Sequence, residues 1–201
     1  MIAPPPNEIS YNNLLDIDAA IRLIDEFDPC SFAILKHNNA CGLASRDKLV
    51  EAWKDALAGD PVSAFGGILI TNMTIDKETA LEMHKIFFEV VIAPGYSDDA
   101  LQVLRQKKNR IILVRKEAEL PKHQHKSLLN GVIWQDLDTK KEVKEDLKAV
   151  TETAPDEKQV SDLLFANLLV KHTKSNAIVL VKNKQLIASG TGQTSRVDAL
   201  K

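Results

Sequence analysis

Short apolar runs alternate along this chain with longer segments in which apolar residues recur at helical spacing. The short runs have the length of buried strands and lie at residues 31–35, 67–70, 89–92 and 110–114. The helical patterns lie at 16–27 after an Asp16 cap, beyond a Ser45 cap, beyond an Asp76 cap with Ala80, Met83 and Phe87 as apolar face, and at 98–106. Since parallel strands need crossover connections, this alternation predicts an α/β fold with a largely parallel sheet.

The second half of the chain is more polar and indicates a junction. The elements expected there are a polar loop at 115–127, a strand at 131–134, a helix at 157–171, and strands at 177–181 and 186–188 around a tight turn at Asn183-Lys184. The segment 136–158 is rich in charged residues and holds Pro155. We therefore expect two subdomains, 1–148 with an extended, proline-rich lead-in at 1–15, and 149–201. No internal repeat stands out.

Composition excludes several classes of protein. The net charge is −2 with both signs interspersed, so we expect no nucleic-acid partner and no attraction to an anionic membrane. No apolar run reaches the roughly 18 residues of a membrane span, and the N-terminus lacks a signal-peptide pattern. Cys30 and Cys41 have no paired spacing, which favours a reducing compartment and therefore the cytoplasm.

No metal site is predicted. His123-Gln124-His125 invites that interpretation, but no Cys, Asp or Glu cluster at ligand spacing accompanies it, and a solvated loop is favoured. The zinc site of nucleotide deaminases is excluded because it needs a C-x-x-C pair, which this sequence lacks.

Four segments place polar residues or glycines where a strand is expected to lead into a helix, the position at which open α/β sheets bind ligands. They are Lys36-His37-Asn38-Asn39, Asp60–Gly67, Glu89 with the turn at Ala93–Tyr96, and Gly190–Arg196. In the first, the Lys can lower the pKa of the adjacent imidazole and make it a base. In the last, backbone amides and an Arg suit a phosphate or another anion.

The residues alone leave each segment open. For Lys36 and His37, spacing alone favours a surface Lys and a structural His. Phe65 could stack on a planar ring or fill the core, and Glu89 could be paired or solvent-exposed. The segment 190–196 could be a plain polar loop, because it has neither the Walker spacing nor the dinucleotide fingerprint.

Taken together and in this order, the segments resemble the transformylase family found in bifunctional purine biosynthesis proteins. The matching stretches are SYNNLLDIDAA (10–20), LKHNNACGLA (35–44), DPVSAFGGI (60–68), EVVIAPGYSDDAL (89–101), DLLFANLLVKHTKSNAIV (162–179) and GTGQTSRVDA (190–199). The resemblance implies formyl transfer from the cosubstrate 10-formyltetrahydrofolate to the 5-amino group of AICAR, giving FAICAR. It also implies cytidine-deaminase-like three-layer α/β/α subdomains without the zinc, no required metal, and a homodimer with shared active sites.

The resemblance assigns roles residue by residue. Lys36 and His37 match the catalytic pair of the family, and Asn176 matches a position that can donate to the oxyanion. Substrate-binding positions are matched by Asn13, Gly66, Glu89 and Arg196, and folate-side positions by Ser63, Phe65 and Val197. Glu89 stands where some members have Asp. Ala40 replaces a proline common in bacterial members, which questions the rigidity of the turn rather than the chemistry.

We expect His37 to take the proton of the weakly nucleophilic amine, with Lys36 keeping the imidazole neutral. The family's IMP cyclohydrolase domain and its L-R-Y-G-E-N-P-H-Q and F-P-F-x-D segments are not in this sequence. We therefore expect an internal fragment with little or no activity alone. The alternative is a non-catalytic nucleotide- or folate-binding fragment, or a dimerisation fragment.

Overall fold

The main body of the protein is one five-stranded sheet. The computed structural model describes residues 9–201, so Pro4 to Pro6 of the expected lead-in lie outside the described residues. The strand order is β2-β1-β3-β4-β5. The strands are β1 (Ser31–Lys36), β2 (Asn39–Ser45), β3 (Ile68–Thr71), β4 (Val90–Ala93) and β5 (Ile111–Val114). β3, β4 and β5 run parallel, whereas β1 pairs antiparallel with both β2 and β3.

The α/β class is confirmed, but the expectation of a largely parallel sheet is wrong because of β2. The sequence analysis did not identify this strand, whose residues NACGLAS include Asn39 and Gly42 and contain no apolar run. Only two residues separate it from β1. A connection this short permits an antiparallel neighbour and no other, so the sheet is mixed.

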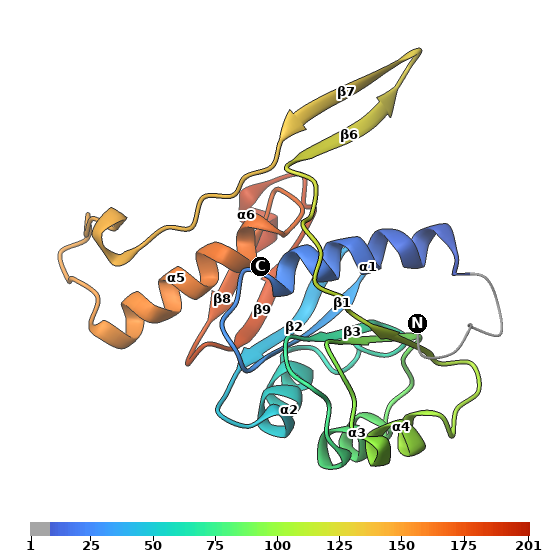
Figure 1. The fold of residues 1–201 in the computed structure, drawn as a ribbon. Helices are drawn as coiled ribbons and strands as arrows, with labels where there is room; N and C mark the ends of the chain where they lie inside the picture. The colour runs from blue at the N-terminus through green and yellow to red at the C-terminus, as the bar shows by residue number, and fades with distance from the viewer. Residues whose placement is uncertain (1–8) are drawn as a thin grey trace.

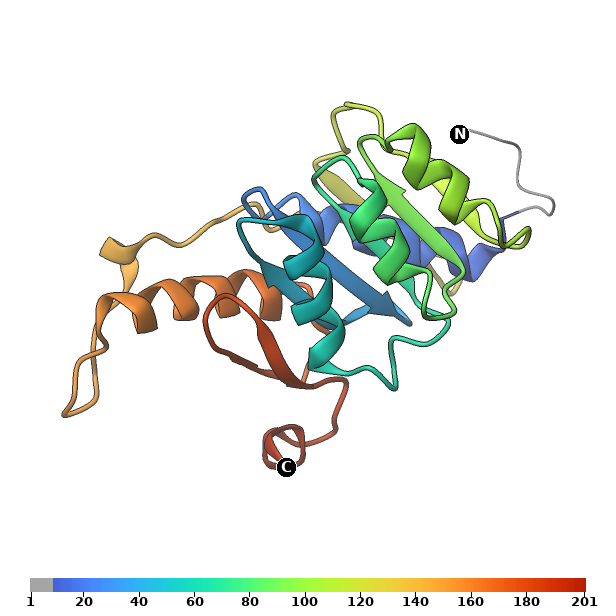
Figure 2. The ribbon, with the colours of Figure 1, turned by 90° about the horizontal axis from the view of Figure 1, so that it is seen from below.

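Helices cover both faces of the sheet, which gives three layers (Figures 1 and 2). α1 (Tyr11–Ile24) lies on one face, and α2 (Leu49–Gly59), α3 (Lys77–Met83) and α4 (Asp98–Leu104) lie on the other. The α1 side buries Ile17, Ala20, Leu23 and Ile24 against strand residues such as Leu35, Ile70 and Ile92. The opposite core is built around Trp53, Phe32 and Phe88. None of the helices within residues 9–201 is long and apolar enough to cross a membrane.

The helix starts differ from expectation in two places. α1 begins earlier than Asp16, because Ser10 caps it by accepting a hydrogen bond from the Asn13 amide at 3.1 Å. Ser45 does not cap α2, because its hydroxyl lies 2.6 Å from the hydroxyl of Ser31 on the neighbouring strand. The N-cap of α2 is Lys48, which makes no side-chain capping bond.

α3 is capped by Asp76 as expected, but one of the three residues expected on its apolar face is not part of the helix. The helix ends at Met83, so Phe87 lies beyond it and is 48% exposed. Phe88 occupies the core instead.

The segment 115–127 is not a loop throughout, because residues 123–128 form a strand. β6 (His123–Leu128) pairs with β7 (Gly131–Asp136) in a separate two-stranded sheet. This hairpin projects from the body of the molecule (Figure 1), and every residue in β6 and β7 is solvent-exposed. A short 3-10 turn, η1 (Lys144–Asp146), follows in the charged segment.

The C-terminal elements repeat the N-terminal ones in the same order. α5 (Glu157–Lys171), β8 (Ile178–Val181), β9 (Leu186–Gly190) and α6 (Arg196–Leu200) follow the order of α1, β1, β2 and α2. The turns His37-Asn38 and Asn183-Lys184 both have two residues with positive φ. Both hairpins also carry a bulge at the same distance before the turn. The repeat is in the backbone rather than in the side chains, which is why the sequence did not reveal it.

The two parts of the chain pack together, and the subdomain boundary after residue 148 stays a prediction. Arg46, which follows β2, donates to the Asn183 carbonyl at 2.7 Å and to the Gln185 side chain at 3.2 Å. The side chain of Asp162 on α5 accepts from the amides of Asn183 and Lys184. The β8–β9 turn is therefore held between α5 and the end of β2.

A charged cluster joins α5 to the end of α1. The Glu26 carboxylate lies 2.7 Å from Lys171 Nζ, 3.2 Å from His172 Nε2 and 3.4 Å from Lys141 Nζ, and its side chain is only 11% exposed. Burial alone would raise the pKa of Glu26, but the bonds from Lys171 and His172 and the two lysine charges outweigh it and hold the pKa below the ordinary value.

We expect Glu26→Gln to lower the free energy of unfolding at pH 7 by about 1–3 kcal/mol, because Lys171 loses its charged partner. The folded pKa of Glu26 lies below 4.5, so the carboxylate contributes fully above that pH and its contribution is lost as the pH falls through the lowered pKa. Urea denaturation at pH 7 and below pH 4.5 should show the difference shrinking with acid. Asp18→Asn is the control, because the Asp18–Arg22 pair is more exposed and contributes about 0.5 kcal/mol or less. An equal loss in both variants would contradict the assignment.

Gly42 allows α2 to lie directly against β2. A Cβ at this position would stand 2.0 Å from the Ala56 carbonyl oxygen, which is helix backbone and cannot yield. We expect Gly42→Ala to destabilise the fold by about 3 kcal/mol. Gly131→Ala, whose Cβ would meet nothing closer than 3.9 Å, should change stability by about 0.5 kcal/mol or less. Thermal denaturation of the pair measures this, and similar melting temperatures would contradict it.

Candidate active site

The Lys36-His37-Asn38-Asn39 segment forms the turn between β1 and β2 rather than a strand-to-helix connection. Lys36 pairs with Asn39, and the two residues between them have φ of 53° and 65°. Positive φ at both central positions is the type I′ geometry that favours Asn-Gly. Placing a His there costs about 1 kcal/mol relative to Gly. The His37 imidazole is consequently held at an exposed tip.

The antiparallel direction of β1 brings three of the four segments to one edge of the sheet. The carboxyl end of β1, with Lys36 and His37, lies beside the amino ends of β3 and β4. Gly66 lies two residues before β3, and Glu89 directly precedes β4. Lys36 and His37 lie at the carboxyl end of a strand as expected, whereas Gly66 and Glu89 lie at amino ends, so for these two the expected strand-to-helix position is wrong.

A cavity of about 300 Å³ at this edge contains five of the expected site residues. Asn13, Lys36, His37, Gly66 and Glu89 all line it. The Asn13 side-chain amide donates to the Glu89 carboxylate at 3.2 Å. The cavity wall thus combines an ammonium, an imidazole, a carboxylate and an amide from three separate segments of the chain.

Lys36 and Gly66 fix the loop opposite the imidazole. Lys36 Nζ donates to the Phe65 carbonyl oxygen at 2.8 Å, and Gly66 has a φ of 74° that only glycine adopts readily. The Phe65 ring is 61% exposed and lies 5.2 Å from the ring of Phe87. Of the two roles considered for Phe65, core packing is therefore wrong, and the ring remains accessible.

A second cavity, of about 280 Å³, lies on the other flank of the turn. Lys36 and His37 line it together with Ser63, Asp60 and Thr191. Asp60 accepts a hydrogen bond from the Ser63 amide at 2.9 Å. Hydrogen bonds from Ser63 lower the pKa of Asp60, so the carboxylate stays ionised beside the lysine. His37 therefore borders two separate cavities.

Besides Phe65, three of the expected residues lie outside both cavities. The Asn176 side chain donates to the carbonyls of Gln193 and Thr194 at 3.1 and 3.3 Å. Arg196 is exposed at the start of α6, and Val197 beside it is 62% exposed. Their roles stay predictions.

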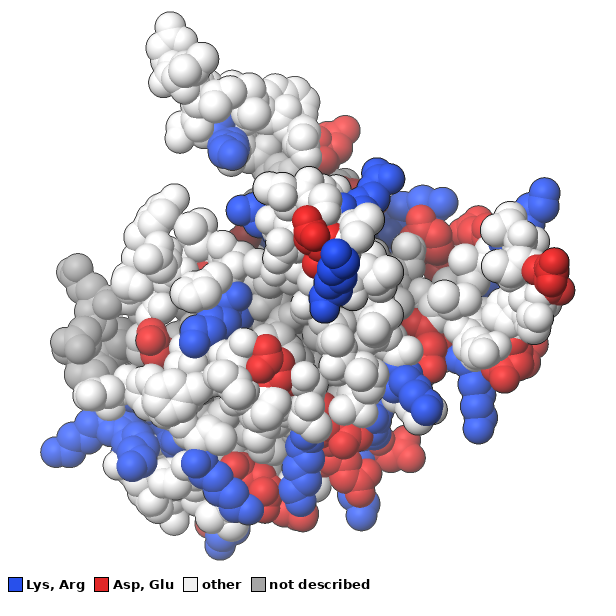
Figure 3. Space-filling model, turned by 180° about the vertical axis from the view of Figure 1, so that it is seen from behind, with Lys and Arg blue, Asp and Glu red and all other residues white. Residues whose placement is uncertain are grey.

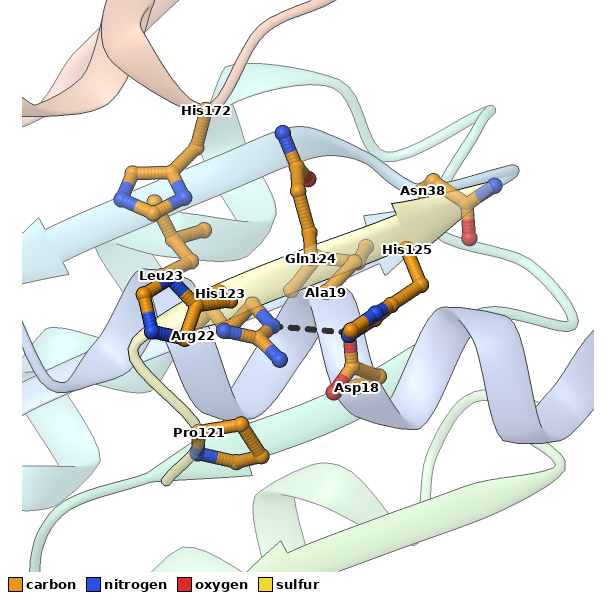
Figure 4. A pocket seen from close by; sticks show the side chains of 11 residues that line it. Asp18, Ala19, Arg22, Leu23, Asn38, Pro121, His123, Gln124, His125 and His172 are labelled. Atoms are coloured by element: carbon orange, nitrogen blue, oxygen red, sulfur yellow. Dashed lines mark hydrogen bonds and ion pairs between the residues drawn. The ribbon is translucent and has the colours of Figure 1, made fainter. Parts of the chain in front are cut away.

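Another cavity, of about 510 Å³, lies between α1 and β6 (Figure 4). Arg22 and His125 line it, as do His123 and His172. Although it is larger, it contains none of the expected site residues. No group of three or more His, Cys, Asp or Glu side chains that could hold a metal ion occurs in the described part of the chain.

Comparison with known proteins shows the family of the chain. The family model of the AICARFT/IMPCHase bienzyme matches residues 6–201. The chain belongs to this family. The bifunctional purine biosynthesis protein PurH of Bacteroides thetaiotaomicron is 70% identical over 194 residues, and that of Limosilactobacillus reuteri 46% over 197, each alignment covering 96% of this chain. The PurH protein of Persephonella marina is 45% identical over 198 residues. The chain spans 38% of the length of these relatives.

In this member of the bienzyme family, sequence reasoning missed several residues around the turn. Asp16 accepts a hydrogen bond from the Asn38 amide at 2.6 Å and lines the first cavity. It follows Asn13 by three positions, and helix residues at that spacing share a face, so this signal could have been found. Thr191 lies in the segment Gly190–Arg196, which was selected as a possible anion site but not as a neighbour of His37. The bond from the Lys174 amide to Asn39, at 2.9 Å, joins distant segments and carries no local signal.

The candidate site also contains a thiol, which we expect to be unreactive. Cys41 lines the second cavity, and burial together with the charge of Asp60 raises its pKa to about 11. In a Cys30→Ala variant at pH 8, alkylation of Cys41 should be about 100-fold slower than that of a free cysteine and should accelerate about tenfold per pH unit up to pH 10. Rapid labelling at pH 8 that does not change with pH would contradict the assignment.

Proposed function

We propose that this chain contributes the proton-accepting part of a formyltransferase site in purine biosynthesis. The site would transfer a formyl group from 10-formyltetrahydrofolate to the 5-amino group of AICAR, giving FAICAR and tetrahydrofolate. The observation that carries the proposal is the position of His37. Its exposed imidazole stands between two cavities at a strained turn, where one cavity can hold the amine and the other the formyl donor.

The first cavity suits the nucleotide. Asn13 and Glu89 offer a donor and an acceptor for amino, carboxamide or hydroxyl groups, and Gly66 lets a planar ring approach the backbone. Ser63 and the exposed ring of Phe65 offer a hydroxyl and an apolar surface for a pterin on the other side. The rear face carries Lys and Arg interspersed with Asp and Glu (Figure 3), which suits a small ligand better than a polyanion.

The chemistry follows from the weak nucleophilicity of an amine conjugated with a carboxamide-bearing imidazole. As its nitrogen bonds to the formyl carbon, His37 accepts the amine proton, and that proton leaves with the folate nitrogen when the tetrahedral intermediate collapses. The Lys36 ammonium, fixed by Phe65, adds positive potential near the developing oxyanion. The mechanism needs no metal and no covalent enzyme intermediate.

We further propose that the site is completed by a second copy of the chain in a homodimer. Asn176 would donate to the oxyanion, Arg196 would hold the phosphate and Val197 would contact the folate. All three lie outside the cavities of their own chain, and Val197 is well exposed. Because a single chain lacks these three groups at its cavities, the alternative function is a nucleotide- or folate-binding fragment without turnover.

We expect His37→Gln to lower the formyl-transfer rate by about 10²–10⁴-fold, because the general base is lost. The assay uses the chain extended at both ends to the length of its relatives and follows the appearance of tetrahydrofolate. His125→Gln is the matched control, since this exposed imidazole lies outside both cavities near the turn.

An unchanged rate in His37→Gln would rule out the catalytic assignment. Heat on titration with AICAR, in an extended chain that shows no transfer, would instead support the binding alternative. The 201-residue chain alone should bind AICAR weakly and turn over little or none of it.

A further inference from the structure

Arg110 is nearly completely buried, yet no carboxylate pairs with it. Its exposure is 7%, and burial lowers the pKa of its guanidinium. No Asp or Glu among residues 9–201 forms an ion pair with it. A buried cation without a counter-ion destabilises the folded state, and an apolar side chain of similar size would be more favourable for folding at this position. The contacts of Arg110 therefore indicate what it does.

The side-chain contacts given for Arg110 all fall on one irregular segment, residues 84–88, which connects α3 to β4. Arg110 Nη1 lies 3.0 Å from His84 Nδ1, and Nη2 donates to the Ile86 carbonyl at 3.3 Å. The guanidinium also lies over the Phe88 ring, 4.1 Å from its centre. Because Arg has no acceptor atom, His84 must accept at Nδ1 and be neutral. Burial and the charge of Arg110 lower the pKa of His84 in agreement with this.

The other side of the same segment forms part of the candidate site. The Phe87 carbonyl accepts from the Gly66 amide at 2.9 Å, which fixes the turn whose carbonyl at Phe65 holds Lys36. Glu89 follows immediately, with its amide bonded to Gly67 and its carboxylate to Asn13. No other side chain in the described part of the chain donates a hydrogen bond to the backbone of residues 84–88.

We propose that Arg110 is a positioning residue that clamps residues 84–88 so that Phe87 and Glu89 keep the geometry of the cavity beside His37. Its effect on ligand binding rests on the proposed function, whereas the clamp itself does not. Loss of the clamp should loosen the Gly66 turn and displace Glu89, while the sheet behind them stays intact.

The test compares Arg110→Met with Arg110→Lys. The first keeps the approximate length of the side chain but removes every hydrogen-bond donor, and the second keeps the charge but loses the planar guanidinium that donates two hydrogen bonds. Arg105→Met is the control, since Arg105 is exposed and makes no side-chain hydrogen bond. Amide hydrogen exchange followed by NMR reports on Gly66 and, as a reference for the sheet, on Ile70 in β3. Calorimetric titration of the chain, extended at both ends to the length of its relatives, measures the affinity of the cavity for AICAR.

In Arg110→Met, exchange at Gly66 should rise about tenfold and AICAR binding should weaken about tenfold, the effect of losing one hydrogen bond to a charged group. Ile70 should not change, Arg110→Lys should be intermediate, and Arg105→Met should match the unmodified chain. Unchanged exchange at Gly66, or an equal rise at Gly66 and Ile70, would overturn the clamp.

The two proposals can fail separately. If the unmodified chain, extended at both ends to the length of its relatives, does not bind AICAR, the proposed function loses its support while Gly66 exchange still decides the role of Arg110. If Arg110→Met does not fold, the same comparison is made with Arg110→Lys, where a rise at Gly66 alone supports the clamp and no rise overturns it.

Discussion

The candidate site depends on the two-residue turn between β1 and β2. Because this turn reverses the chain at once, β1 runs against β3, and its carboxyl end meets the amino ends of β3 and β4. In an all-parallel sheet, Lys36 would lie at the opposite edge from Gly66 and Glu89. The bond from Lys36 to the Phe65 carbonyl fastens the two sides of the site together.

Local patterns predicted the elements whose apolar residues are continuous or periodic. β1, β3, β4 and α5 lie within a residue or so of their expected positions, because burial on one or both faces dictates their residues. β2 and β6 were missed for a different reason. Gly42 in β2 is required by the approach of α2, and β6 is polar except for Leu128. Each of these strands is therefore defined only by its pairing with the neighbouring strand of its hairpin.

The site could be predicted in parts. Family resemblance selected Asn13, His37 and Glu89, which the structure brings to one cavity, although Asn13 and Glu89 are 76 positions apart in the sequence. Residue patterns alone did not reveal that the first segment is a hairpin turn. Arg110 carried no signal, because a single Arg before a strand is indistinguishable from a surface residue until its burial is known.

The two hairpins share their backbone geometry but differ in what surrounds each turn. In the β8–β9 turn, Asp162 accepts from both central amides and Arg46 donates to the Asn183 carbonyl, so packing within the chain satisfies the turn. In the β1–β2 turn Asp16 accepts from the Asn38 amide in a similar way, and the difference is that the His37 side chain faces two cavities. The strained residue at this turn, the buried Arg110 cation and the exposed ring of Phe65 all lie along one edge of the sheet. Each is unfavourable for folding by itself, and costs of this kind persist in proteins where function requires them.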